Sequence, residues 1–251
     1  MFAWWRKRER DDDFDDSDES DDDDFDDSDE DDELDDEDED EADEDDAASA
    51  VVGALARDGQ LVRLRCHVPA NRPAFQRWYA DDEIARLLRH DQQPLTERQS
   101  RGYFDTLILP LSARGQCFAI HERASDRLIG TTAITDFTTR RGGARSALFR
   151  IVIGEKETWN RGYGTEATRL AMAEAFERLG LDEVRLEVFR HNPRALRAYE
   201  RVGFRVLGEH VEHVGRPRME LQVIEMALSR QAFEALNAPD EAEPSPDITP
   251  G

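Results

Sequence analysis

Residues 150–176 read "RIVIGEKETWNRGYGTEATRLAMAEAF": an apolar run, a turn with two glycines, and then a helical pattern. A strand followed by such a turn and a helix presents backbone N–H groups at the positive end of a helix dipole, where phosphate groups bind. Gly162 and Gly164 have no Cβ atom, so a ligand can approach the backbone closely. The stretch therefore predicts a phosphate-binding turn between a strand and a long helix over residues 161–179.

The letters "GYGTEA" also fit the fingerprint G-x-G-x-x-A, which is typical of dinucleotide-binding enzymes. Such a domain opens near its fingerprint and continues through several strand–helix–strand units. Here the residues after Gly162 predict one parallel crossover followed by a hairpin. Glu187, 25 residues after Gly162, lies inside the predicted strand 182–189, whereas a ribose ligand belongs at a strand end. A dinucleotide-dependent oxidoreductase is therefore the weaker alternative.

The periodicity of the remaining residues predicts the other elements. Further strands are expected at about 60–68, 116–122, 127–137, 145–153, 204–213 and 217–228, and helices within 69–90, 94–111, 192–203 and 229–236. Thr96 and Gln99 have the spacing of a capping box, and Asn192 with Pro193 has that of a helix start. The order predicts an α+β fold: a single domain with a mixed, mostly antiparallel sheet of six to seven strands, flanked by helices.

The acidic charge is concentrated at the start of the chain. Residues 1–46 hold 30 of the 58 acidic residues and 4 of the 33 basic ones, and "DDDFDDSDE" occurs at both 11–19 and 22–30. Such a segment cannot bury enough apolar surface to fold, and its charges repel one another. We expect a disordered acidic tail and linker at 1–57, a domain at 58–237 and a flexible end at 238–251.

The composition disfavours several classes of protein. No apolar run of 18 residues predicts a membrane span, and the charged first residues are not followed by the apolar segment of a secretory signal. Cys66 and Cys117 fit a structural role in a reducing compartment, and no metal-ligand spacing involves them. We expect a cytoplasmic protein without a metal ion and without direct contact to nucleic acid or membrane.

A second motif, "VRLEVFRHNPRALRAYERVGF" at 184–204, completes a resemblance. Together with residues 150–176 it resembles the GNAT superfamily of acetyl-CoA-dependent N-acetyltransferases, over roughly residues 60–230. The most similar branch is the one that acetylates the N-terminal alanine or serine of ribosomal proteins, together with its polyamine- and antibiotic-modifying relatives. The resemblance implies a GNAT domain at 58–237 that uses acetyl-CoA as a cosubstrate and no metal.

The resemblance also assigns coenzyme A ligands. The pyrophosphate is expected on the turn formed by Arg161, Gly162, Tyr163, Gly164 and Thr165. In the family, the strand containing Ile151, Val152 and Ile153 separates from its parallel neighbour at 186–188, and the pantetheine arm lies between them. A backbone N–H near Val152 would then polarise the thioester carbonyl. Asn192, which the residue pattern predicts as a helix cap, is implied as a further coenzyme ligand.

Tyr199 is the catalytic residue that the resemblance implies. Acyl transfer expels a thiolate that needs a proton, and a tyrosine at this position is the usual general acid of the family. A core tyrosine that packs the short helix is the alternative. The general base is less clear, because Leu148 stands where relatives often carry a carboxylate. Asp136, predicted to end the preceding strand, could act through water or be an ordinary surface acid.

The acceptor is expected to be a primary amine, either on a small molecule or at the N-terminus of a basic protein such as a ribosomal protein. The acidic tail could attract such a cationic substrate, or serve only as a solubilising extension. A non-catalytic acetyl-CoA-binding module of the same fold, acting as a sensor or partner-binding protein, remains the alternative function. The sequence leaves the oligomeric state open, a homodimer included.

Overall fold

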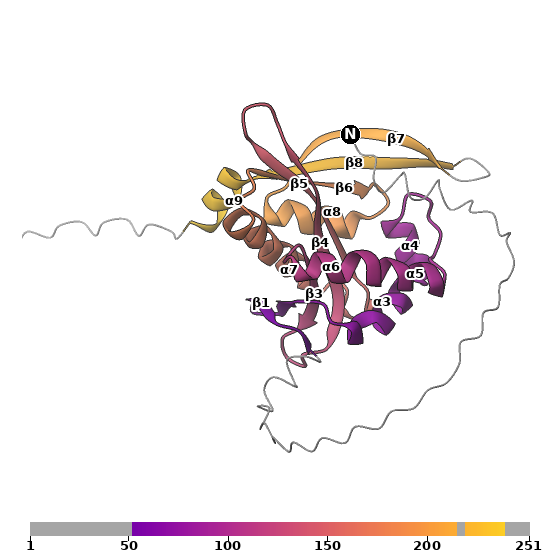
Figure 1. The fold of residues 1–251 in the computed structure, drawn as a ribbon. Helices are drawn as coiled ribbons and strands as arrows, with labels where there is room; N and C mark the ends of the chain where they lie inside the picture. Colours follow the sequence, from indigo (N-terminus) through magenta and orange to yellow (C-terminus); the bar gives the residue numbers. More distant parts are fainter. Residues whose placement is uncertain (1–51, 215–218, 239–251) are drawn as a thin grey trace, which may run out of the picture. The chain divides into compact units, whose positions relative to one another are not determined.

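A computed structural model describes residues 52–214 and 219–238 (Figure 1). The expectations for the acidic segment up to residue 51 and for the end from residue 239 concern residues outside these ranges. The strands are β1 (Leu55–Asp58), β2 (Val62–Arg65), β3 (Cys117–Glu122), β4 (Leu128–Thr139), β5 (Arg145–Ile153), β6 (Glu183–Phe189), β7 (Arg205–Val214) and β8 (Met219–Ser229). The helical segments are η1 (Pro69–Asn71), α3 (Arg72–Tyr79), α4 (Asp82–Leu88), α5 (Glu97–Tyr103), η2 (Phe104–Ile108), α6 (Leu109–Ala113), η3 (Lys156–Thr158), α7 (Tyr163–Ala173), η4 (Glu174–Arg178), α8 (Pro193–Val202) and α9 (Arg230–Asn237).

These strands form one eight-stranded sheet in the order β1-β2-β3-β4-β5-β6-β8-β7. The α+β architecture is confirmed, but the predicted count of six to seven strands is wrong. The additional strand is β1, which pairs with β2 and lies mainly within residues 1–57, where the sequence predicts a tail and linker. Its four residues, "LARD", are exposed or half-buried and show no clear apolar alternation. A short edge strand of this kind leaves little trace in a sequence.

The turn between β1 and β2 is fastened to α7 by Glu166. Its carboxylate accepts hydrogen bonds from the backbone N–H groups of Gln60, Leu61 and Val62 at 2.8, 2.6 and 2.7 Å. A carboxylate in the first turn of a helix also interacts favourably with the helix dipole. Glu166 therefore fixes the first turn of α7 against the sheet.

The pairing of β5 with β6 positions the site. Among the described strands this is the parallel pair, and it runs only from Ser146 opposite Glu183 to Leu148 opposite Arg185. Beyond that point β5 continues to residue 153 and β6 to residue 189 without pairing to each other. We call residues 149–153 and 186–189 the open strand ends. They occur where the resemblance predicts that the two strands separate.

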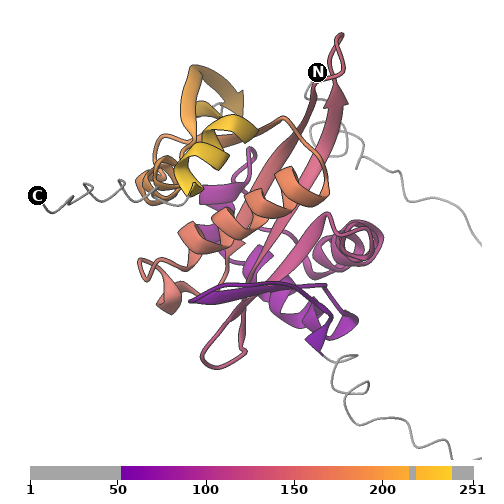
Figure 2. The ribbon, with the colours of Figure 1, turned by 90° about the vertical axis from the view of Figure 1, so that its left-hand side faces the viewer.

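Helices pack on both faces of the sheet (Figures 1 and 2). On one face, α7, η4, α8 and α9 cover the larger core, in which Phe176 is fully buried. On the other, α3, α4 and the α5–η2–α6 run cover an aromatic core around Phe75. Because successive side chains of a strand point to opposite faces, Phe149 of β5 belongs to the larger core and Val152 to the aromatic core.

The structure confirms two elements that short stretches of sequence predict, a helix cap and a hairpin turn. Thr96 and Gln99 form the predicted capping box at the start of α5. The exposed link between β4 and β5 is a hairpin turn, closed by a hydrogen bond from Arg140 N–H to Ala144 C=O at 2.9 Å, and the hairpin projects beyond the helices (Figures 1 and 2). No helix among the described residues is long and apolar enough to cross a membrane.

Candidate active site

The loop after β5 is held rigidly against the sheet. The indole N–H of Trp159 donates to the carbonyl of Ile153 at 2.7 Å, and that of Trp78 donates to Glu155 Oε1 at 2.8 Å. Gly154 lies flat on the Trp78 ring, where an added Cβ would come within 2.1 Å of Cδ2. These contacts fix the direction in which the chain enters the glycine turn.

The turn itself exposes the first amides of α7. Gly162 has φ +86°, a conformation that a residue with a Cβ atom rarely adopts. The N–H groups of Tyr163, Gly164 and Thr165 are in the first turn, where a helix offers no carbonyl partner. The packing does not require a glycine at 164, because a Cβ there would make only an ordinary 3.6 Å contact with Ile153 Cγ1. Close approach of a ligand would explain it.

Two side chains of the turn have different surroundings. Arg161 is exposed, so its guanidinium can reach an anion bound at the turn. The Tyr163 hydroxyl instead donates to Glu122 of β3, and this hydrogen bond is the main reason why the pKa of Tyr163 is raised. Tyr163 can therefore contact an anion at the turn through its backbone N–H but not through its side chain.

Ile151, Val152 and Ile153 lie on the open strand end of β5. Ile151 and Ile153 are half-buried against the larger core, and Val152 is buried in the aromatic core. In a strand, alternate N–H and C=O groups point toward the two neighbouring strands. β4 pairs with one edge of these residues, and the β6 edge stays unpaired. An extended ligand can hydrogen-bond to that edge as a strand would.

Tyr199 of α8 lies where the pairing of β5 and β6 ends. Its ring packs edge-on to Phe149, the first residue of the open strand end, with 6.5 Å between centroids, and lies 5.9 Å from the Phe204 ring. The side chain is buried, and burial raises the pKa of its phenol. Within residues 52–214 and 219–238 the hydroxyl has no hydrogen-bond partner. Tyr199 can therefore hold a proton for a group that enters between the strands.

Asn192 caps α8, as the sequence predicts. Its side-chain oxygen accepts a hydrogen bond from the N–H of Ala195 at 3.2 Å. Among residues 52–214 and 219–238 the amide nitrogen of the same side chain makes no hydrogen bond. The structure thus brings Asn192 and the glycine turn to the same end of β5 and β6, because α7 follows β5 through the loop that contains η3, and α8 follows β6 through a short loop. Tyr199 contacts the open strand end through Phe149.

Neither Leu148 nor Asp136 is well suited to act as a general base. Leu148 is the last residue of β5 that pairs with β6, and its apolar side chain is buried. Asp136 does not end its strand as predicted, because β4 continues through an irregularity between Thr135 and Thr138. A bulge of this kind is hard to place from sequence. The Asp136 carboxylate is exposed and lies 3.8 Å from Arg150 Nη2.

A chain of acids and histidines next to the open strand end of β6 was missed. His90, which follows α4, lies between Glu212 Oε2 at 2.6 Å and Glu187 Oε2 at 3.4 Å. His210 continues the chain, 3.2 Å from Glu212 Oε1 and 3.3 Å from Glu225 Oε1. The five residues come from the stretch just after α4, from β6 and from the β7–β8 hairpin, so sequence spacing gives no sign that His90 and Glu187 join the cluster. We call it the acid–imidazole chain.

The two carboxylates next to His90 favour its charged form. Burial alone would lower its pKa, but hydrogen bonds and charge interactions with Glu187 and Glu212 outweigh burial, and the pKa is raised. A raised pKa means that the charged form stabilises the fold. This contribution is complete below the pKa of an unfolded histidine, near about 6.5, and is lost as the pH rises through the raised value.

Replacing His90 by phenylalanine should therefore destabilise the protein mainly at low pH. We expect the free energy of unfolding to fall by roughly 1.5–3 kcal/mol at pH 6, the typical worth of hydrogen bonds to a charged group, and by much less at pH 9. Denaturant unfolding at both pH values measures this. His213→Phe is the control, because His213 is exposed and lies 3.6 Å from the exposed carboxylate of Glu220. An equal loss at both pH values would show that His90 contributes packing alone.

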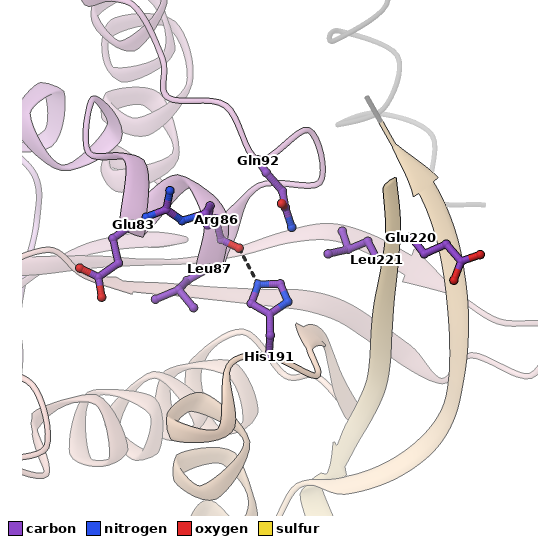
Figure 3. Close-up of a pocket in the computed structure, with 7 residues that line it drawn as sticks. All are labelled: Glu83, Arg86, Leu87, Gln92, His191, Glu220 and Leu221. Atoms are coloured by element: carbon purple, nitrogen blue, oxygen red, sulfur yellow. Dashed lines mark hydrogen bonds between the residues drawn. The ribbon is translucent and has the colours of Figure 1, made fainter. Parts of the chain in front are cut away.

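An open hollow with a volume of about 370 Å³ lies between α4, the β6–α8 loop and β8 (Figure 3). The His191 ring points across it to the backbone carbonyl of Arg86, 2.8 Å from Nε2. The lining of the hollow holds the acidic Glu83 and Glu220 together with the basic Arg86. The carboxylates that favour a cationic ligand are those of the acid–imidazole chain, next to the open strand end of β6.

Comparison with known proteins identifies the domain. Residues 62–205 match the family model described as acetyltransferase (GNAT) domain. A spermidine N-acetyltransferase from Vibrio cholerae, solved in complex with CoA and spermine, superimposes with a TM-score of 0.59 at 20% identity, over 70% of this chain and 99% of that one. A GNAT-family acetyltransferase from Bacillus anthracis superimposes with a TM-score of 0.58 at 15% identity, over 70% and 99% of the two chains.

At these identities the structural matches establish the fold, and the family model establishes the relationship. That model covers more than half of the chain and includes β2 to β6, the glycine turn and α8. The protein therefore belongs to the GNAT acetyltransferase family.

Proposed function

We propose that the protein transfers an acetyl group from acetyl-CoA to a primary amine on a molecule that carries further positive charge. The observation that carries the proposal is the end of β5–β6 pairing at Leu148 and Arg185. The strands are unpaired beyond that point, and the groups next to them are the N–H donors of the α7 turn, the buried phenol of Tyr199 and the carboxylates of the acid–imidazole chain. This is the set of groups that direct transfer between a thioester and an amine requires.

The residues present fit coenzyme A as the acetyl carrier. The amides of Tyr163 to Thr165 and the Arg161 side chain offer donors to a pyrophosphate. The unpaired edge of Ile151 to Ile153 offers an extended arm the hydrogen bonds of a missing strand. A backbone N–H near Val152 would stabilise negative charge that develops on the thioester oxygen. Asn192 would add a side-chain donor from the other side.

The proton transfers can be assigned to two side chains. The acceptor nitrogen attacks the thioester carbonyl carbon, so a C–N bond forms and the C–S bond breaks. Tyr199 would give its proton to the leaving sulfur, and Glu187 would take the proton that the nitrogen loses. Glu187 lies two residues beyond Arg185, on the same strand face. Cys117 is unsuited to carry the acetyl group, because burial raises its pKa to about 12.

The acceptor molecule should carry at least one positive charge in addition to the amine that reacts. The carboxylates of Glu187, Glu212 and Glu225 form an acidic surface around His90 and His210. Such a surface attracts polycations and disfavours acidic substrates. A polyamine and the N-terminus of a basic protein, such as a ribosomal protein, both meet this requirement. An α-amine needs less help to lose its proton than a lysine-like amine does.

The test is calorimetric titration of the full chain with acetyl-CoA, coenzyme A and NADH, followed by an acetylation assay. We expect both coenzyme A species to bind and NADH to give no signal. Spermidine and a basic peptide with N-terminal alanine should then be acetylated faster than an acidic peptide with the same terminus. Binding without acetylation of any amine would support the alternative of a non-catalytic module, which the leucine at position 148 favours. Binding of NADH alone would refute the proposal.

A further inference from the structure

Arg194 connects the two loops that follow the open strand ends. The central carbon of its guanidinium lies 3.5 Å from the centroid of the Trp159 ring. Trp159 follows β5, and Arg194 is in the first turn of α8, which follows β6. Because β5 and β6 are not paired beyond Leu148 and Arg185, this contact crosses the end at which the strands are apart.

The Arg194 cation has no acidic partner in the described part of the chain. Within residues 52–214 and 219–238 it makes no hydrogen bond and no ion pair, and it rests on the indole alone. Glu83 is the carboxylate whose charge acts on it. That carboxylate is already bound by Lys156, whose Nζ lies 3.0 Å from Glu83 Oε2. The charge of Arg194 is therefore not neutralised locally.

Partial burial makes an unpaired cation unfavourable. Arg194 is half-buried, and burial lowers the pKa of its guanidinium. Removing a charge from water costs free energy unless a counter-charge replaces the water. A guanidinium that stacks on an indole keeps its N–H donors directed outward in the plane of the group, where they can grip an oxyanion. The position is thus prepared for an anion.

The neighbours of Arg194 indicate which anion it binds. Trp159 and Arg161 belong to the same turn, and the first amides of α7 follow it directly. We propose that Arg194, supported by Trp159, binds a phosphate group of coenzyme A from the α8 side, across from the α7 amides. This inference rests on the proposed function and adds to it a specific phosphate ligand from α8. It also gives the indole a role as a platform that sets the direction of the guanidinium.

The test compares Arg194→Gln with Arg98→Gln in the full chain. Arg98 is exposed on α5, and among the described residues it makes no hydrogen bond or ion pair. We expect the Kd of coenzyme A, measured by calorimetry at about 20 mM salt, to rise about fivefold for Arg194→Gln and to stay unchanged for Arg98→Gln. The difference should shrink at about 300 mM salt, because salt screens the charge interaction. Arg194→Lys, which keeps the charge, should bind better than Arg194→Gln.

Dephospho-coenzyme A, which lacks the 3′-phosphate, tells which phosphate is bound. If the defect of Arg194→Gln persists with this ligand, the pyrophosphate is the partner; if the defect disappears, the 3′-phosphate is. Both results agree with the proposal. An unchanged Kd, or an equal rise at both salt concentrations, overturns it. Failure of the parent protein to bind coenzyme A is a separate result, which removes the proposed function and this inference with it.

Discussion

Replacing Tyr199 by phenylalanine is expected to lower kcat at least tenfold while leaving the affinity for acetyl-CoA nearly unchanged. A thiolate that leaves without a proton is a poor leaving group, and the buried phenol at the end of the β5–β6 pairing is the donor that we assign to it. Phenylalanine keeps the ring that packs against Phe149 and Phe204. Only the hydroxyl is lost. Steady-state kinetics with a saturating amine and calorimetric titration with acetyl-CoA measure the two quantities.

The pH dependence of the parent protein provides an independent check on Tyr199. A general acid must be protonated to act, and burial raises the pKa of this phenol. The parent should therefore keep its kcat through mildly alkaline pH, where an ordinary tyrosine, with a pKa near about 10, begins to ionise. Thermal unfolding of Tyr199→Phe controls for lost packing. A variant that turns over within twofold of the parent would show that Tyr199 is only a core residue.

The parts of the fold that could be predicted are those with local signals. The helix caps at Thr96 and Asn192, the glycine turn and the β4–β5 hairpin depend on residues close together in sequence, and all lie as predicted. β1 was missed because a short edge strand that is exposed on one side needs no apolar alternation. The irregularity that holds Asp136 was missed because it depends on the register between two strands.

The candidate site also consists of one half that has local sequence signals and one half that has none. Its coenzyme half consists of two contiguous motifs, so the sequence places those residues together, although their role as ligands stays a prediction. Its acceptor half depends on contacts across long separations, such as that of His90 with Glu187 and Glu212. The position of Glu187 inside a strand disfavours a ribose ligand. A proton acceptor, in contrast, can act from mid-strand where the neighbouring strand is unpaired.

Replacing Glu187 by glutamine should lower kcat/KM about 100-fold at pH 7, with much less effect near pH 10. A lysine-like amine has a pKa near about 10.4, so at neutral pH almost all of it is protonated and needs a base before it can attack. At alkaline pH the free amine is present without help, and the variant should approach the parent. Glutamine preserves the size of the side chain next to His90, 3.4 Å away. Rates measured from pH 6.5 to pH 10 test this.

Two comparisons separate proton transfer from substrate binding. Glu209→Gln is the matched control, because Glu209 is exposed on β7 and pairs with the exposed Arg190. An acceptor amine of low pKa should reduce the defect of Glu187→Gln at pH 7, since less of that amine needs to be deprotonated. A loss of the same size at every pH and with every amine would mean that Glu187 only attracts the cationic substrate. The base would then have to be sought elsewhere along the acid–imidazole chain, with Glu212 the next carboxylate, on the other side of His90.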